Sequence, residues 1–248
     1  MRRTVFSICL VLCLAFSARP PRLRIFLAGD STMSEKDMRA YPETGWGMPF
    51  VHFWDEGVEV VNRARNGRST RTFLSEGLWA GLLADMAAGD YVFVQFGHND
   101  ESPEKADRYT TVEVYVANLR RFVGEVRDRK GIPVLMTPVG RRRFDSNGNV
   151  LESHALYSAA VRSLAEREAV VLIDADSLSR RFYQSLGVEG SRMLFLQLSP
   201  GEHPNYPSGK TDNTHFNELG ARKVAQLVLS EIRRQLPVLA RHVVHSDR

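Results

Sequence analysis

Cysteine is scarce in this sequence, and its apolar runs are short. The 248 residues contain two cysteines, Cys9 and Cys13, and both lie near the N-terminus. The chain beyond residue 18 therefore has no disulfide, no thiol nucleophile and no cysteine metal ligand. The apolar run Val5–Phe16 is shorter than the stretch of about 20 residues that spans a bilayer as a helix. It therefore has to be explained in another way.

The first residues follow the order of a secretory signal. Arg2 and Arg3 precede the apolar run, and small residues at positions 15, 17 and 18 are followed by an arginine and two prolines. A basic start, an apolar middle and a small-residue cleavage site are typical of export signals. We expect residues 1–18 to be a secretory signal peptide and residues 19–248 to form a single domain that is secreted or periplasmic. An N-terminal anchor helix is the alternative.

Charge of one sign is not in large excess either. The 33 lysines and arginines are nearly balanced by 29 aspartates and glutamates, which leaves a formal net charge of +4. The sequence has no repeat, no low-complexity segment and no long interleaving of aromatic with basic residues. A small net charge is poor evidence for nucleic-acid binding. We therefore expect no nucleic-acid partner and, once the signal is removed, no stable association with a membrane.

Short apolar runs alternate with segments of helical periodicity along the rest of the chain. Strands are expected at 23–28, 58–62, 91–96, 132–137 and 169–173, and helices at 112–131, 154–167, 176–186 and from about 217 to 236. This alternation predicts an α/β fold, a three-layer α/β/α sandwich with a mainly parallel sheet of about five strands. Residues 196–211, rich in proline and glycine, are expected to form a long loop, and such loops are often functional.

The first strand ends in a serine that is suited to nucleophilic attack. Leu23–Ala28 is a short run that is apolar at every position but Arg24, which is typical of a strand buried on both faces. It breaks at Gly29 and places Asp30 and Ser31 at the carboxyl edge of the sheet, where ligands bind in open α/β folds. A hydroxyl there, with backbone N–H groups behind it, can attack an ester and hold the resulting oxyanion. Alone, Gly-Asp-Ser is also compatible with a plain turn.

Two further strand ends carry polar groups toward the same edge. Gly67 follows the second strand, and its backbone can approach a ligand closely. The third strand ends at Gly97–Asp100, where Asn99 can donate an amide N–H to an oxyanion or simply close an Asx turn. Its neighbours His98 and Asp100 are expected to support this turn.

Asp212 and His215 form a compact pair just before the last helix. The carboxylate can accept a hydrogen bond from Nδ1 and fix the ring, which leaves Nε2 free to take a proton from a serine. The same spacing occurs in capping arrangements and in pairs of metal ligands. A metal site built from His98, Asp100, Asp212 and His215 is therefore an open alternative.

Four segments together resemble the SGNH (GDSL) hydrolase superfamily in their order and context. They are Gly-Asp-Ser at 29–31, Asn-Gly-Arg-Ser at 66–69, Gly-His-Asn-Asp at 97–100 and Asp-Asn-Thr-His at 212–215. Finer details, in 45–47, 95–100 and 212–220, resemble the rhamnogalacturonan acetylesterase branch, carbohydrate esterase family twelve. The resemblance covers essentially all of the chain after the signal and implies the flavodoxin-like SGNH fold. The Gly-x-Ser-x-Gly of α/β-hydrolases, which share the order Ser, Asp, His, is absent around Ser31.

The resemblance implies a serine esterase without metal or organic cofactor. By match, Ser31 is the nucleophile, His215 the general base and Asp212 the residue that orients it. The oxyanion hole would consist of the backbone N–H groups of Ser31 and Gly67 and the side-chain amide of Asn99.

The implied substrate is an acetylated polysaccharide or oligosaccharide, foremost rhamnogalacturonan, which would be deacetylated through an acetyl-serine intermediate. The alternatives are other acyl esters, such as acetylxylan or lipid, and a carbohydrate-binding module without catalysis.

Residues that could contact such a substrate are proposed from residue type alone. Arg68 and Arg71 could pair with galacturonate carboxylates, because arginine suits bidentate carboxylate contacts. His203 and Tyr206 in the long loop could shape the sugar site. The run Arg141–Arg143 is better explained as a solvated basic face.

Overall fold

The computed structural model describes residues 22–244, so the expected signal peptide lies outside the described part of the chain. The strands of this part are β1 (Leu23–Gly29), β2 (Val58–Asn62), β3 (Tyr91–Gln95), β4 (Ile132–Met136), β5 (Val171–Ile173), β6 (Phe195–Leu198) and β7 (Lys210–Phe216). Its α-helices are α1 (Gly47–Phe50), α2 (Thr70–Ser75), α3 (Leu78–Asp85), α4 (Val112–Asp128), α5 (Ala155–Arg167), α6 (Ala175–Gly190), α7 (Glu218–Gln235) and α8 (Pro237–Ala240). Short 3₁₀ helices are η1 (Met38–Ala40), η2 (Val51–Phe53) and η3 (Ser191–Leu194).

Five parallel strands form the main sheet in the order β2-β1-β3-β4-β5. This is the flavodoxin-like order, in which the chain reverses its direction of winding between β1 and β3. The carboxyl ends of β2, β1 and β3 are therefore neighbours. The predicted fold class is confirmed, and the three strand ends that carry the motifs meet at one edge of the sheet.

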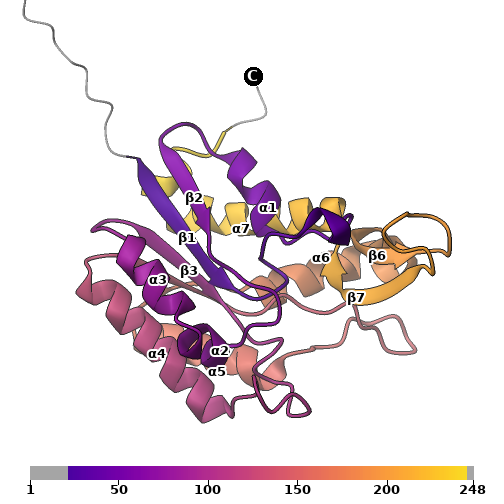
Figure 1. Ribbon diagram of the computed structural model, residues 1–248, viewed down its shortest axis with the longest axis horizontal. Coiled ribbons are helices and arrows are strands. Elements are labelled where there is room, and N and C mark those ends of the chain that lie inside the picture. The colour runs from indigo at the N-terminus through magenta and orange to yellow at the C-terminus, as the bar shows by residue number, and fades with distance from the viewer. Residues whose placement is uncertain (1–21, 245–248) are drawn as a thin grey trace, which may run out of the picture.

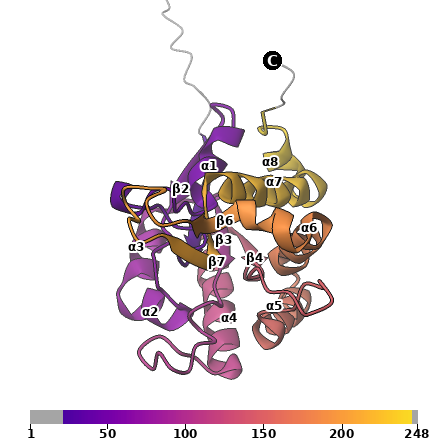
Figure 2. The same ribbon diagram turned by 90° about the vertical axis from the view of Figure 1, so that its right-hand side faces the viewer.

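Alternating side chains of β1 enter two separate cores. Ile25 and Leu27 pack on one side of the sheet, in a core shared with α1, α6, α7 and α8. Phe26 and Ala28 pack on the other side, in a core shared with α3, α4 and α5. Figures 1 and 2 show these two helical layers with the sheet between them. Because both faces are covered, the strand is apolar from Ile25 onward, which explains why it was recognisable in the sequence.

The segment expected to be a long loop is in part an antiparallel hairpin. β6 and β7 pair with each other, Leu196 opposite Asp212 and Leu198 opposite Lys210, and the true loop is confined to residues 199–209. The prediction was wrong at the two ends because β7 is a polar strand, and its side chains gave no apolar alternation. In Figure 1 this hairpin stands apart from the main sheet.

Two boundaries in the second half of the chain also differ from the prediction. Strand β5 begins at Val171, after the non-glycine residue Ala169 adopts a positive φ of 48° that no strand contains. Helix α6 extends to Gly190 across a kink at Gly187, beyond the expected end at residue 186. Neither difference moves a motif residue.

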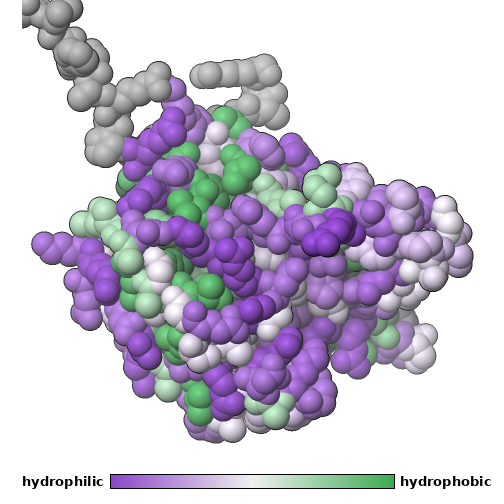
Figure 3. All heavy atoms as spheres, viewed as in Figure 1, coloured by the Kyte–Doolittle hydropathy of each residue, from purple (hydrophilic) through white to green (hydrophobic). Residues whose placement is uncertain are grey.

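Within residues 22–244, no helix combines the length and the apolar character that crossing a bilayer requires. On the face drawn in Figure 3, polar residues predominate and apolar ones occur in small groups.

Candidate active site

Ser31 stands directly beyond the carboxyl end of β1, on a turn that Asp30 holds in place. The carboxylate Oδ1 of Asp30 accepts hydrogen bonds from the backbone N–H of Thr32 (2.9 Å) and from its hydroxyl (2.8 Å). The backbone oxygen of Asp30 accepts from the N–H groups of Met33 and Ser34. Asp30 is fully buried, so the turn is fixed from inside the molecule. The predicted position of Ser31 at the sheet edge is what the structure has.

Ser31, His215 and Asp212 form a continuous hydrogen-bonded chain. The hydroxyl of Ser31 lies 2.9 Å from Nε2 of His215, and Nδ1 of His215 lies 2.8 Å from Oδ2 of Asp212. The first two residues are 184 positions apart in the sequence, and only the hairpin brings them together. When a hydroxyl, an imidazole and a carboxylate are hydrogen-bonded in this order, a proton can pass from the serine to the histidine while the carboxylate keeps the ring oriented.

Asp212 is held as an ionised acceptor by its own strand. Its Oδ1 accepts hydrogen bonds from the backbone N–H groups of Thr214 (2.7 Å) and His215 (3.0 Å). Burial alone would raise the pKa of this carboxyl, but the hydrogen bonds from the ring and backbone of His215 outweigh burial and hold the pKa well below its usual range. A carboxylate that stays charged can stabilise the imidazolium that forms when the base takes a proton.

Three N–H donors lie on the turns that follow the neighbouring strands β1, β2 and β3. Within residues 22–244, the backbone N–H groups of Ser31 and Gly67 donate to no protein acceptor. Gly67 has a φ of +73°, a conformation that side-chain-bearing residues rarely adopt. Asn99 is buried and spends one amide hydrogen on the backbone oxygen of Arg68 (3.0 Å), which leaves its second hydrogen available. The geometry is compatible with the predicted oxyanion hole, and that role stays a prediction.

Of the two residues expected to support the turn around Asn99, Asp100 does so, whereas His98 lies beneath the serine turn instead. Asp100 accepts hydrogen bonds from the backbone N–H of Thr70 (3.0 Å) and from the hydroxyls of Thr70 (2.5 Å) and Thr110 (3.0 Å). It thereby ties the end of β3 to the start of α2. His98 lies 3.4 Å from Oδ2 of Asp30, beneath the serine turn. The two flanking residues are thus structural supports of two different turns.

The pKa values of His98 and Asp30 are both shifted at this buried contact. Burial and the neighbouring His154 lower the pKa of His98 to about 4, so the ring is neutral at neutral pH. Burial raises the pKa of Asp30, but the His98 ring and the hydrogen bonds from Thr32 outweigh it and hold the pKa at about 2. His98 in turn packs on His154, with ring centroids 4.3 Å apart, and Nδ1 of His154 lies 2.8 Å from Oε2 of Glu101.

The four residues of the alternative metal site do not form one cluster. His98 lies beside Asp30, Asp100 is occupied by two threonines, and Asp212 is occupied by His215. In the described part of the chain, no group of three or more histidine, cysteine, aspartate or glutamate side chains is arranged to hold a metal ion.

The arginine run at 141–143 supports the hairpin, a role that the sequence did not indicate. Nη1 of Arg141 donates to the hydroxyl of Thr214 (2.7 Å), and Nη1 of Arg142 donates to Oδ1 of Asn213 (2.9 Å). Arg141 also pairs with Glu101. For these two residues the expectation of a solvated basic face was wrong, because they brace the strand that carries His215.

The four residues proposed for substrate contact lie in two places. Arg68 pairs with Glu76, and Arg71 donates to the backbone oxygen of Ala106 (3.2 Å), beside the turn of Gly67. His203 and Tyr206 lie in the hairpin loop and lean on the segment around η1, where the Tyr206 hydroxyl donates to the backbone oxygen of Ala40 (2.7 Å). Their contacts with substrate remain predictions.

Sequence reasoning missed several polar residues near the serine. His154 carries no motif context in the sequence, and it is buried against His98 and Glu101. Lys36 was not singled out, yet its ammonium group contacts the backbone of Ser31. A lone lysine in a loop carries no recognisable spacing, so no sequence signal pointed to it.

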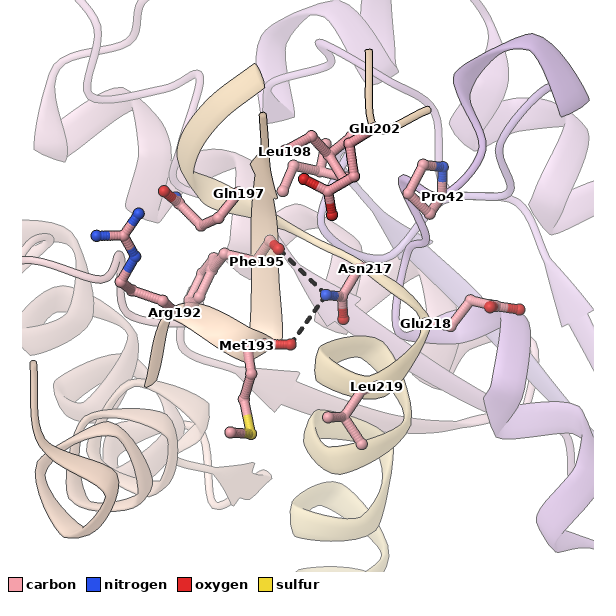
Figure 4. Close-up of a pocket in the computed structure, with 11 residues that line it drawn as sticks. Pro42, Arg192, Met193, Phe195, Gln197, Leu198, Glu202, Asn217, Glu218 and Leu219 are labelled. Atoms are coloured by element: carbon pink, nitrogen blue, oxygen red, sulfur yellow. Dashed lines mark hydrogen bonds between the residues drawn. The ribbon is translucent and has the colours of Figure 1, made fainter. Parts of the chain in front are cut away.

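Two surface pockets are lined by residues that are close in sequence to Ser31 or His215. Neither is lined by Ser31, His215 or Asp212 themselves. One, of about 520 Å³, is formed by β6, Pro42 and the start of α7. Figure 4 shows Asn217 at its centre, where its amide donates to the backbone oxygens of Met193 and Phe195. The other, of about 690 Å³, lies across Glu218 from it and is lined by Lys36, Glu43 and Tyr41, among others.

Comparisons with known proteins agree with this geometry. The chain matches the GDSL-like lipase/acylhydrolase family over residues 27–223. It is 40% identical over 225 residues to the rhamnogalacturonan acetylesterase RhgT of Bacillus subtilis (strain 168), covering 91% of this chain and 96% of that protein. It is 34% identical over 210 residues to the probable rhamnogalacturonan acetylesterase YesY of the same organism, covering 84% and 92%.

A solved structure supports the fold independently. The crystal structure of the protein YxiM from Bacillus subtilis matches with a TM-score of 0.74 at 28% identity, covering 87% of this chain and 57% of that one. This chain therefore spans little more than half the length of that relative.

Proposed function

The chain belongs to the GDSL-like lipase/acylhydrolase family, and from this membership we propose that it removes O-acetyl groups from rhamnogalacturonan. As a member of that family it is an ester hydrolase of the SGNH type. The choice of substrate rests on the rhamnogalacturonan acetylesterase RhgT, which is 40% identical to this chain over 225 residues. The observation that carries the proposed chemistry is the hydrogen-bonded chain from Ser31 through His215 to Asp212.

In the proposed reaction the Ser31 hydroxyl attacks the acetyl carbonyl while Nε2 of His215 takes its proton. The carbonyl oxygen becomes an oxyanion, which receives hydrogen bonds from the N–H groups of Ser31 and Gly67 and from the Asn99 amide. As the oxyanion collapses, the bond to the sugar oxygen breaks, and His215 returns its proton to that leaving oxygen. Water then attacks the acetyl-serine in the same way, and acetate and free Ser31 result.

The charge around the oxyanion donors supports an acidic polymer. A Cβ placed on Gly67 would stand 2.9 Å from Nη1 of Arg108, so a guanidinium group lies over this turn. Arg68 and Arg71 lie beside it. Galacturonate residues carry a carboxylate each, and arginine binds carboxylates with directed pairs of hydrogen bonds.

Acetate release from a panel of acetylated glycans tests the proposal. We expect release from acetylated rhamnogalacturonan to exceed that from acetylated xylan, and both to exceed cleavage of long-chain lipid esters. Ser31→Ala serves as the control for chemical background. A preference for acetylxylan or for lipid esters would overturn the substrate while leaving the esterase. A fully active Ser31→Ala variant would overturn the proposed nucleophile.

We also propose that the protein acts outside the cytoplasm. Support comes from the basic, apolar and small-residue order of residues 1–18 alone. Mass spectrometry of the protein recovered from periplasm and medium would find a mature N-terminus near residue 18. Recovery of the intact chain from the cytoplasm would contradict export.

A further inference from the structure

Lys36 follows the serine turn, and its side chain is turned into the protein. The side chain is only 2% exposed, although lysine is among the residues least often buried. Its Nζ lies 2.6 Å from the backbone oxygen of Ser31, 2.7 Å from Oδ1 of Asn66 and 2.7 Å from Oε1 of Glu43. Each of these acceptors belongs to a different segment of the site.

The number of contacts matches a charged ammonium group. An ammonium group donates three hydrogen bonds and accepts no hydrogen bond, and Lys36 has three oxygen acceptors around it. A neutral amine would have only two hydrogens for them. Burial lowers the pKa of Lys36, while Glu43 and, more weakly, Asp30 and Asp212 raise it. These three carboxylates are the charged groups that face the ammonium, and they keep its charge in place.

Two of the three segments carry groups of the proposed reaction centre, the nucleophile and the oxyanion donors. Ser31 supplies the nucleophile and one oxyanion donor, and Asn66 directly precedes Gly67, which supplies another. The hydroxyl of Ser34 also donates to Oδ1 of Asn66 (2.5 Å), so the serine turn and the glycine turn are joined at one oxygen. Glu43 anchors the ammonium from the segment that leads into α1.

We propose that Lys36 is a positioning residue, whose ammonium group fixes the spacing between the serine turn and the N–H donor of Gly67. The inference rests on the proposed roles of Ser31 and Gly67. A displacement of about 1 Å between reacting groups can cost two orders of magnitude in rate, so a clamp of this kind acts on turnover rather than on substrate affinity.

Turnover of p-nitrophenyl acetate, a small neutral ester, tests the clamp. In Lys36→Met we expect kcat to fall between roughly tenfold and a hundredfold with KM changed less than about threefold. Lys223→Met, an exposed lysine on α7, is the matched control and should keep the parent kcat. Lys36→Met leaves the Glu43 carboxylate without its ion-pair partner Lys36. The double variant Lys36→Met/Glu43→Gln is therefore measured as well, and thermal unfolding shows whether both variants are folded.

A pH profile separates positioning by charge from simple packing. Glu43→Gln keeps an oxygen for the ammonium but removes the charge that raises its pKa, so we expect the alkaline loss of kcat to move to lower pH than in the parent. In folded Lys36→Met this alkaline limb should be absent. A parent-like kcat in Lys36→Met, or a Glu43→Gln profile that superimposes on the parent, would overturn the clamp. A fully active Ser31→Ala variant would instead overturn the proposed function on which it rests.

Discussion

The nucleophile and the base reach the same point from two unlike regions of the molecule. Ser31 follows a strand in the interior of the main sheet, on a turn held by the fully buried Asp30. His215 lies on a hairpin outside that sheet, and its side chain is 28% exposed. The serine is positioned by the core, whereas the histidine is positioned by hydrogen bonds among residues 212–215 and by two arginines.

Because the two residues are positioned differently, substitutions near His215 and substitutions beneath Ser31 should affect stability and activity in different proportions. Substitutions on the hairpin side should remove activity and leave the fold intact. Substitutions beneath the serine turn should affect both.

Ser31→Ala should have the largest effect on turnover. Without its hydroxyl no acyl intermediate can form, and we expect kcat to fall roughly 10⁴-fold or more with thermal unfolding within about 1 °C of the parent. Ser75→Ala, an exposed serine at the end of α2, is the matched control. Turnover within tenfold of the parent would break the assignment of the nucleophile.

Asp212→Asn should have the next largest effect, and it tests the hairpin side. Asparagine keeps the size of the side chain but cannot stabilise a positive ring, so we expect kcat to fall roughly 10²- to 10⁴-fold. The core is not involved, and the unfolding temperature should change little. A large loss of stability with a modest loss of turnover would show instead that this pair supports the fold more than it serves the reaction.

Asn99→Ala should lower kcat roughly 10²-fold or more, because one oxyanion donor is lost. The substitution also removes the bond to the backbone of Arg68, so a small decrease in stability is expected on this side of the site. Steady-state kinetics with p-nitrophenyl acetate and thermal unfolding measure the two effects together. Parent-like turnover would refute the donor role.

The smallest effect concerns the pH dependence of stability beneath the serine turn. Burial and His154 lower the pKa of His98 from its ordinary value near 6.5 to about 4, so between these values the unfolded chain binds a proton that the folded chain does not. The free energy of unfolding should therefore decrease as the pH falls from about 6.5 to 4. The pKa of Asp30, lowered to about 2, adds a further loss only below about pH 4.

Urea unfolding of the parent, of His98→Gln and of the control His52→Gln, at an exposed histidine, measures this dependence. We expect about 1–3 kcal/mol of acid destabilisation in the parent, with less in His98→Gln than in His52→Gln. An equal slope in all three proteins would assign the acid sensitivity to another group.

The buried side of the site could be predicted from the sequence, because its strands are apolar and its turns follow them directly. Ser31, Gly67 and Asn99 each come within five residues of an apolar strand, and strand order then brings them together. Trp46, in the loop between the serine turn and α1, is fully buried, and its indole N–H donates to Gln95 (2.9 Å).

The hairpin side was harder to predict for a physical reason. β7 is a polar strand stabilised by cross-strand pairing and by arginine side chains from residues 141 and 142, and neither leaves a hydrophobic period. The pair of Asp212 and His215 was found only through its local spacing. Lys36 and His154 depend on contacts between distant segments, so a single sequence carries no trace of them.

The spacing of Asp212 and His215 within one strand has a consequence for how such enzymes can diversify. The carboxylate and the imidazole travel together as a unit, and the loop of residues 199–209 enters the hairpin ahead of both. That loop can be lengthened, shortened or exchanged without altering the distance between acid and ring. New glycan preferences can thus be grafted onto an unchanged proton-transfer apparatus.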